Sequence, residues 1–413
     1  MKIARLQLLA ALAAVGIAAA APAPAQRRDS QVITAASVAG GTRDFALRLY
    51  RELAREERDN IFFSPVSIAL AITPLASGAD GETRTGIQRA LSLPEVGPEL
   101  SSALGSLQRA LERDRDRTQV SIANAIWLNR ENRLRPEFLE TARTHFEATA
   151  EMLDFGGDPR GAAARINRWA DTETRGRIPS VVAPGQFNEH TRLVITNAVY
   201  FLADWQTPFE PESRAAPFTL ADGRRIDVPT MEQLGEFRHH RRRGFAALDL
   251  PYRDERLVMT VLLPDSPTGL AALERSLTPS LLNRTLRSLD RSEPVRVDLT
   301  LPRFTLQDSY LLNIPLAQLG MGTAFALEAD FRGVSAEPLR ISRVTHSTFL
   351  RVDEQGTEAA AVTVVDSVII TGSRPMPPPI PFHADRAFMF MLRDRDSGAI
   401  LFFGRIMRPS EVE

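Results

Sequence analysis

The sequence predicts an α+β fold in one large domain. Segments with apolar residues at helical spacing gather in the first half of the chain, whereas strand-like segments dominate from Phe218 onward. In addition, residues 192–201 are apolar on both faces of an extended strand, which is typical of a position at the centre of a large sheet. We therefore expect antiparallel or mixed sheets.

The expected helices are identified by their apolar spacing and by the residues at their ends. Residues 42–57 repeat apolar side chains every four positions. Ser64 and Pro65 then begin a helix that is apolar nearly all round, which predicts burial, and Pro74 is expected to kink or end it. Further helices are expected at 83–91, 99–117, 136–146, 162–173, 270–287 and 309–319.

The expected strands are short runs rich in β-branched and aromatic residues, bounded by turn residues. The first is Ile61-Phe62-Phe63, directly before the buried helix. The others are expected at 120–128, 192–201, 220–228, 246–250, 257–263, 295–301, 349–352, 387–393 and 400–403.

Composition limits the classes of function. The chain has 413 residues, no cysteine and a formal net charge of −1. Without cysteine there can be no disulfide, thiolate metal site or cysteine nucleophile. Mixed charges that nearly cancel give no footprint for nucleic acid, so we expect no nucleic-acid partner.

Residues 1–25 have the pattern of a secretory signal peptide. Lys2 and Arg5 precede an apolar run, and small residues then offer a cleavage site. The run is short for a membrane span, although a retained N-terminal anchor is the alternative. We expect export to a periplasm or the exterior, and no membrane association once the signal is removed.

The sequence contains no motif that would support an enzyme. A nucleophile elbow, a zinc-binding H-E-x-x-H pattern and a phosphate loop are all missing. None of the six histidines has metal-ligand spacing with a partner. The basic run at 238–243 could bind a polyanion, but a solvated hairpin between strands is the simpler interpretation. We therefore predict no cofactor, no metal and no catalytic residue.

The stretch from Val352 to Pro381 has two different faces when it is considered as a strand. One face is uncharged and could be buried in a sheet, and it holds Thr357, Ala359, Ala361, Thr363, Val365 and Ser367. The other face carries both charges and could face solvent, and it holds Glu358, Ala360, Val362, Val364 and Asp366. Small residues and Gly356 are weak strand formers, so the stretch can become a strand without being held as one. The five prolines from Pro375 to Pro381 are expected to forbid a paired strand.

Several segments resemble the serpin family and occur in the family's order from about residue 42 to 409. They include NIFFSPVSIALAITPLASGADGETRTGIQRAL (60–91), NAVYFLADWQTPF (197–209), LDLPY and LLP (248–264) and LPRF (301–304). The others are LGMGTAF and ADFRGV (319–334), DEQGTEAAAVT (353–363) and FHADRAFMFMLRDRDSGAILFFGRIMRP (382–409). The resemblance implies a serpin fold with a large central mixed sheet, two further sheets, about eight to nine helices and an exposed reactive-centre loop.

The resemblance also implies an arrangement of domains and a function. After a flexible segment at 26–41, residues 42–409 would form a single serpin domain, with the reactive-centre loop at about 354–381. A serpin offers this loop to a protease as bait, and after cleavage the loop enters the central sheet and traps the protease covalently. The implied function is therefore suicide inhibition of serine proteases by a monomer. The alternative is a non-inhibitory serpin, a binding or chaperone-like protein whose loop is only cleaved.

By this resemblance, the loop hinge that enters the sheet extends from Glu354 to Val362. Inhibition requires small, unhindered residues here, and Thr357, Ala359, Ala360 and Ala361 fit. The hinge residues are Glu354, Gly356, Thr357, Glu358, Ala359, Ala360, Ala361 and Val362. Val362 is bulkier than is usual in the family, but it falls on the face expected to meet solvent.

Five further residues match family positions beneath or at the end of the central sheet. Ser64, Ser67, Asn197 and His346 match the cluster that rearranges when the sheet opens. Ser64 could equally serve only as a helix cap. Trp205 matches the tryptophan where insertion begins, and ordinary core packing is the alternative for it.

Family spacing from Gly356 places the scissile bond between Ile370 and Thr371. Counting back from Phe382 gives Met376-Pro377 instead, which is a poor substrate because proline follows the bond. Val368 and Ile369 remain open alternatives. Ile370 implies a serine protease with an apolar primary pocket, of the elastase, subtilisin or chymotrypsin type, and a cysteine protease is a further possibility.

Overall fold

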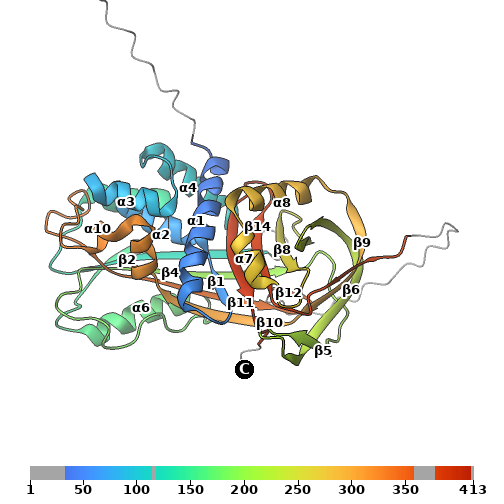
Figure 1. The fold of residues 1–413 in the computed structure, drawn as a ribbon. Helices are drawn as coiled ribbons and strands as arrows, with labels where there is room; N and C mark the ends of the chain where they lie inside the picture. The colour runs from blue at the N-terminus through green and yellow to red at the C-terminus, as the bar shows by residue number, and fades with distance from the viewer. Residues whose placement is uncertain (1–32, 114–117, 358–376, 411–413) are drawn as a thin grey trace, which may run out of the picture. The chain divides into compact units, whose positions relative to one another are not determined.

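The computed structural model of the chain describes residues 33–113, 118–357 and 377–410. Helices dominate the N-terminal half and strands the C-terminal half, as predicted (Figure 1). The longer helices are α1 (Ala35–Glu56), α2 (Pro65–Ser77), α3 (Gly81–Leu91), α4 (Pro98–Leu111), α5 (Pro136–Phe146), α6 (Pro159–Glu173) and α8 (Pro279–Arg291). The shorter ones are α7 (Leu270–Ser276), α9 (Asn313–Leu316) and α10 (Gly322–Phe325).

A six-stranded mixed sheet, called the central sheet below, lies in the middle of the fold. Its strands are β2 (Gln119–Asn129), β3 (Thr149–Leu153), β4 (Leu193–Asp204), β10 (Phe304–Leu311), β11 (Ile341–Val352) and β12 (Gly356–Thr357). They follow the order β10-β11-β12-β4-β2-β3. β4 pairs in parallel with β11 and antiparallel with β2, so the strand predicted to be central is central.

A second sheet of nine strands carries the rest of the β structure. Its strands are β1 (Ile61–Phe63), β5 (Arg214–Thr219), β6 (Arg225–Arg242), β7 (Phe245–Pro251), β8 (Leu257–Pro264), β9 (Pro294–Pro302), β13 (Ile380–His383), β14 (Phe388–Asp394) and β15 (Ile400–Ile406). β6 is 18 residues long and pairs with β5 and β9 through its first part and with β7 through its last. The two further sheets implied by the resemblance are thus continuous through β6.

Side chains of the central sheet alternate between two buried layers. Trp127 from β2 and Val194 and Ala198 from β4 pack against Ile166 and Trp169 of α6. The alternate side chains of β4 face the core between the sheets, on the side of α2. α6 and α2 therefore cover opposite faces of the central sheet (Figure 1).

α2 forms because Ser64 and Pro65 begin it as the sequence predicts. The Ser64 hydroxyl accepts the Ser67 N–H at 3.3 Å, and Pro65 occupies the first helical turn. All residues from Pro65 to Ala76 are buried, as the apolar pattern predicts. Pro74 does not end the helix, which continues to Ser77. Pro74 lacks the N–H that would bond to the Leu70 carbonyl, but only three residues of the helix follow it.

The segment predicted as a helix at 309–319 is helical only from Asn313 onward. Ser309 and Leu311 belong to β10, where they pair with Ser347 and Thr345 of β11. Pairing along β11 overrides the helical spacing of the apolar residues. The segment predicted at 270–287 is divided into α7 and α8, because Thr278 caps a new helix that starts at Pro279.

The prolines do not prevent a paired strand at their C-terminal end. β13 contains Pro381 and pairs in parallel with β9, with Pro381 opposite Asp298. The prediction is wrong here because β13 lies at the edge of its sheet, where a missing N–H leaves no neighbour unpaired. By contrast, the basic run at 238–243 is a hairpin between β6 and β7, as its simpler interpretation predicts.

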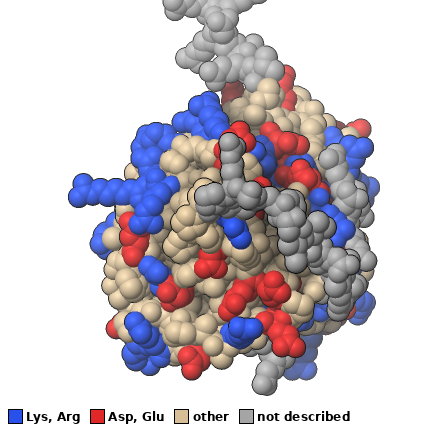
Figure 2. Space-filling model, turned by 90° about the vertical axis from the view of Figure 1, so that its right-hand side faces the viewer, with Lys and Arg blue, Asp and Glu red and all other residues tan. Residues whose placement is uncertain are grey.

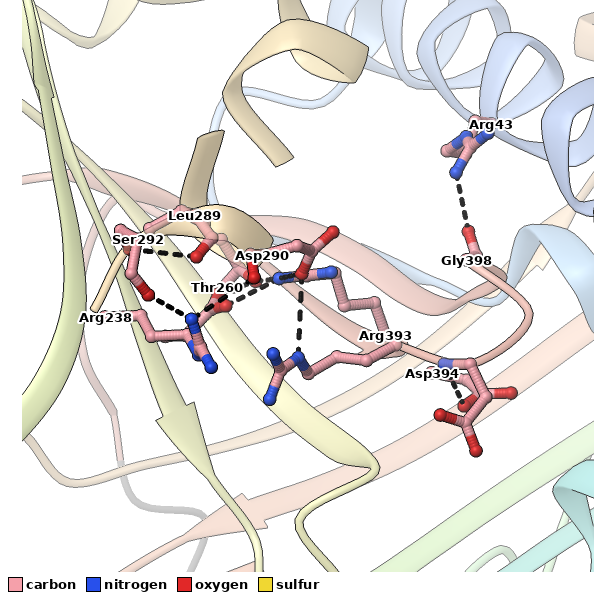
Figure 3. Close-up of polar contacts among 12 residues, drawn as sticks. Arg43, Arg238, Thr260, Leu289, Asp290, Ser292, Arg393, Asp394 and Gly398 are labelled. Atoms are coloured by element: carbon pink, nitrogen blue, oxygen red, sulfur yellow. Dashed lines mark hydrogen bonds and ion pairs between the residues drawn. The ribbon is translucent and has the colours of Figure 1, made fainter. Parts of the chain in front are cut away.

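A buried ion-pair network ties α8 to the second sheet (Figure 3). Arg393 of β14 is 2% exposed and lies 2.5 Å from Asp249 of β7 and 2.9 Å from Asp290 of α8. Its Nε also donates to the hydroxyl of Thr260 at 2.9 Å. Such a network fixes the position of α8, since removing one partner would leave a buried charge unpaired.

Within the described ranges, no helix combines the length and apolarity needed to cross a membrane. In the same ranges, no group of three or more acidic or histidine side chains is placed to hold a metal ion. Basic and acidic side chains both occur on the face drawn in Figure 2, in keeping with the near-zero net charge.

Candidate functional site

β4 and β11 are direct neighbours along most of their length. They pair in parallel from Leu193 opposite Ile341 to Tyr200 opposite Phe349. We call this line of pairing the seam. Beyond it the two strands separate, and β12 lies between them, antiparallel to both. The site is therefore a sheet in which a third strand has started at one end of a closed seam.

Gly356 and Thr357 form this short strand, and both fit tightly. Thr357 pairs with Ala203 of β4 and with Val352 of β11. A Cβ on Gly356 would lie 2.1 Å from the Ala203 carbonyl oxygen, so only glycine fits. The Thr357 side chain is fully buried, and its hydroxyl lies 2.8 Å from the Tyr252 hydroxyl.

Trp205 holds the segment that precedes β12. Its backbone N–H donates to the Gln355 carbonyl and its indole N–H donates to the Asp353 carbonyl, both at 2.9 Å. Its ring stacks on Tyr252 with centroids 4.5 Å apart. Trp205 is also 1% exposed, so it is packed in the core as well as bonded to the segment before β12.

The turn from β11 into β12 is fixed by two carboxylates. Asp353 accepts the backbone N–H groups of Gln355 at 3.1 Å and Gly356 at 3.3 Å, and burial raises the pKa of its carboxyl. Glu354 lies 3.6 Å from the guanidinium of Arg303. The hinge therefore enters the sheet from a well-anchored turn.

The four residues of the predicted sheet-opening cluster, Ser64, Ser67, Asn197 and His346, are brought together beneath the seam. His346 Nε2 accepts the Ser64 N–H at 2.9 Å, so its Nδ1 carries the proton. That proton is donated to Asn197 Oδ1 at 2.5 Å, and the Asn197 amide in turn donates to Ser67 Oγ. The cluster thus links α2, β4 and β11 through one chain of hydrogen bonds.

Burial sets the protonation of this cluster. His346 is fully buried, and burial lowers its pKa to about 3. The imidazole is therefore neutral at any physiological pH. A neutral ring can both accept from Ser64 and donate to Asn197, whereas a protonated ring could only donate.

The sequence pattern missed two polar partners of the site. Asn124 of β2 lies directly opposite Asn197 and accepts from its amide at 2.6 Å. An amide between apolar residues of a predicted strand was the available signal. Tyr252, the partner of Thr357, is the last residue of the matched LDLPY segment, but nothing in that segment indicated its contact with the hinge.

The rest of the predicted loop lies outside the described residues. This holds for the hinge residues Glu358, Ala359, Ala360, Ala361 and Val362, and for the predicted scissile pair Ile370 and Thr371. The structure places Glu354, Gly356 and Thr357 at the open end of the seam, and the sheet-opening cluster midway along it.

The comparisons with known proteins agree with this geometry. The family model described as Serpin (serine protease inhibitor) matches residues 41–409. An uncharacterized serpin-like protein of Thermococcus kodakarensis is 38% identical, over 91% of this chain and 86% of its own length. The leukocyte elastase inhibitor of Sus scrofa is 35% identical, over 88% of this chain and 97% of its own.

Solved structures show the same fold. Human thyroxine-binding globulin, solved in complex with thyroxine, superposes with a TM-score of 0.82 and 26% identity, over 92% of this chain and all of that one. The fold, the site in the central sheet and the comparisons together identify the class of protein as one with the fold of the serine protease inhibitors. The chain belongs to the serpin family.

Proposed function

We propose that this protein is a suicide-substrate inhibitor of serine proteases and not an enzyme. A protease would cut between Ile370 and Thr371, and the loop N-terminal to the cut would enter the seam and trap the protease covalently. The observation that carries this proposal is β12, a strand of two residues that is antiparallel to both β4 and β11. An entering strand would continue this pairing.

The pairing of β12 gives the register in which the loop would enter. Thr357 lies opposite Ala203, so continuing one residue at a time brings Thr363 opposite Asn197. The same count from β11 brings Thr363 opposite His346. Opposed residues share a face of the sheet, so the uncharged face of the loop would meet the core and Thr363 would reach the sheet-opening cluster.

The same register changes the expectation for Val362. It would lie opposite Ala198, which is buried against α6. The sequence pattern assigned Val362 to a face open to solvent, whereas α6 covers this part of the central sheet. Bulk at this position would therefore slow insertion.

The target we propose is a serine protease with an apolar primary pocket, since Ile370 precedes the predicted scissile bond. Arg374 is followed by Pro375, which would protect it from trypsin-like enzymes. No cofactor is needed, and one inhibitor would be consumed for each protease. We further propose that the protein is exported after removal of residues 1–25 and acts as a monomer.

The test is to incubate the mature protein separately with pancreatic elastase, subtilisin, chymotrypsin and trypsin, and to analyse the products on denaturing gels. We expect a complex that resists denaturant with at least one of the first three proteases. Mass spectrometry should then find a C-terminal peptide that begins at Thr371. Cleavage without complex across the panel would reject the proposal.

That negative outcome would favour a second function, a non-inhibitory binding protein. The observation behind it is the similarity to thyroxine-binding globulin, a serpin fold solved with a small ligand. The small, unhindered hinge residues Gly356 and Thr357 favour the inhibitor instead, since they allow the loop to enter the sheet.

A further inference from the structure

Two adjacent cavities lie at the closed end of the seam, where the pairing of β4 and β11 begins. The first has a volume of about 280 Å³, and its lining includes Phe325, Arg340 and Arg343. The second has a volume of about 210 Å³, and its lining includes Arg192, Leu327 and Leu339. They share His190 and Arg340, and we call them together the polar-end groove. β12 lies at the other end of β11.

The polar-end groove is lined by cationic side chains and by no acidic residue. Arg343 is half-buried, its Nε donates to the Thr345 hydroxyl at 3.1 Å, and burial lowers its pKa. Among the described residues, neither Arg340 nor Arg343 forms an ion pair. Arg192 lies 3.9 Å from the Glu131 carboxylate and donates to the Glu189 backbone carbonyl at 2.7 Å. A partly buried cation without a counter-ion is costly, and a bound anion would remove that cost.

Apolar side chains stand beside these arginines. Leu327 is 81% exposed, and Phe325 and Leu339 also line the groove. An exposed leucine of this size next to uncompensated arginines is suited to a ligand with one anionic and one apolar end. A purely inorganic anion would leave the apolar side of the groove unused.

We propose that the polar-end groove binds an amphipathic carboxylate, such as a medium-chain fatty acid. The carboxylate would be held by Arg340 and Arg343, whose guanidinium groups match its geometry. The chain of the ligand would lie over Phe325 and Leu327.

Such a ligand would join the two strands that must part, because in the groove it would also lie against Arg192. Arg343 belongs to β11, and Arg192 directly precedes β4 and already donates its N–H to Ser342 Oγ of β11 at 2.8 Å. A molecule that contacts both sides would hold the closed end of the seam and slow insertion. This regulatory part rests on the proposed function, whereas the binding itself does not.

Binding is tested by titrating the mature protein with sodium octanoate in a calorimeter, with octanol and acetate as matched ligands that lack one end. We expect saturable binding of octanoate alone, weakened about tenfold or more by Arg340→Gln and by Arg343→Gln. Arg225→Gln, which changes an exposed arginine on β6, should bind as the wild type does. Equal binding of all three ligands, or unchanged affinity in both groove variants, would overturn the inference.

The regulatory part is tested by the rate at which the protein forms a denaturant-stable complex with elastase, with and without octanoate. We expect slower formation with octanoate in the wild type and in Arg225→Gln, and no effect in Arg343→Gln. If complexes form but octanoate neither binds nor slows them, this inference fails alone. If octanoate binds but no covalent complex ever forms, the proposed function is wrong, whereas the inference that the groove binds a carboxylate stands.

Discussion

His346 Nδ1 and Asn197 Oδ1 form a hydrogen bond of 2.5 Å across the seam, between residues that are also paired in the register of β11 and β4. The two strands therefore cannot separate at this level without breaking the bond. Because His346 also accepts from Ser64, the opening of the sheet is linked to the start of α2. We propose that this single side chain links closure of the seam to α2.

We predict that His346→Ala destabilises the closed sheet by about 2 kcal/mol or more, because it leaves the Ser64 N–H and Asn197 Oδ1 buried without a partner. The midpoint of urea unfolding should fall accordingly. His383→Ala, on the partly exposed β13 histidine, is the matched control and should change little. Equal midpoints for His346→Ala and wild type would contradict the assigned role.

The low pKa of His346 predicts a dependence of stability on pH. Its pKa is about 3 in the folded protein and 6.5 by default, so below about pH 6.5 the unfolded chain binds a proton that the folded protein does not. This contribution to stability is complete above pH 6.5 and is lost as pH falls toward 3. The loss can reach about 1.4 kcal/mol per pH unit.

Two buried carboxyls act in the opposite direction and must be separated from this effect. Burial raises the pKa of Glu112 to about 7 and that of Asp308 to about 6. Each of these carboxyls therefore makes the folded protein more stable as pH falls. Urea midpoints of wild type and His346→Gln, measured from pH 7.5 to 4.5, isolate the histidine. The gap between them should shrink as pH falls, and a constant gap would show that His346 does not titrate as assigned.

Thr357→Arg should convert the inhibitor into a substrate. The Thr357 side chain is fully buried between β4 and β11, so an arginine there would carry an unpaired charge into the sheet. We expect normal cleavage by the target protease but at least about tenfold fewer covalent complexes per cleavage. Gln355→Arg adds the same charge two positions earlier at a half-exposed site and should still inhibit. Undiminished complex formation by Thr357→Arg would reject insertion at this position.

Gly356→Ala should displace β12 from the sheet. Its Cβ would lie 2.1 Å from the Ala203 carbonyl oxygen, a distance that backbone atoms cannot accept. Displacement would weaken the contacts of Asp353 and Gln355 with Trp205, so tryptophan emission should shift toward that of an exposed indole. The shift should be absent when Trp205→Phe is combined with the variant, because the other tryptophans are remote from the hinge. An unchanged spectrum would mean that the strand tolerates the methyl group.

Val362→Ala should make inhibition more efficient. In the register of β12 it would lie opposite Ala198 beneath α6, where a smaller side chain enters more easily. We expect fewer cleaved inhibitors per covalent complex, measured as the stoichiometry of inhibition. Ala360→Val, on the same face of the loop, should have the reverse effect. An equal stoichiometry in all three proteins would place Val362 outside the inserted strand.

The sequence allowed much of the fold to be predicted, because local signals and tertiary structure agree there. β4 was predicted from its apolar faces and α2 from Ser64 and Pro65, and both are found. The last three residues of β10 were misread as helix, since their helical spacing is overridden by pairing with β11. Pro381 was misread because edge position cannot be inferred from a local pattern.

The site could be predicted only in part, for a similar reason. The residues matched by resemblance, such as Asn197 and His346, come together in space beneath the seam, whereas their roles stay a prediction. Asn124 and the groove arginines belong to no recognised motif, and only the pairing of β2, β4 and β11 places them near the seam. Whether the face that carries Val362 would be buried likewise depends on α6, which lies far from Val362 in the sequence.

The position of the C-terminal strands has a consequence for a molecule cut after Ile370. β14 lies inside the second sheet between β8 and β15, and β15 is covered in turn by β1. The fragment that begins at Thr371 would contain β13, β14 and β15, and these strands would keep it bound by hydrogen bonds and packing alone. A cleaved molecule should therefore elute from a native sizing column at its full mass and divide in two only in detergent. Cleavage of the peptide bond after Ile370 would therefore leave β13, β14 and β15 in the second sheet.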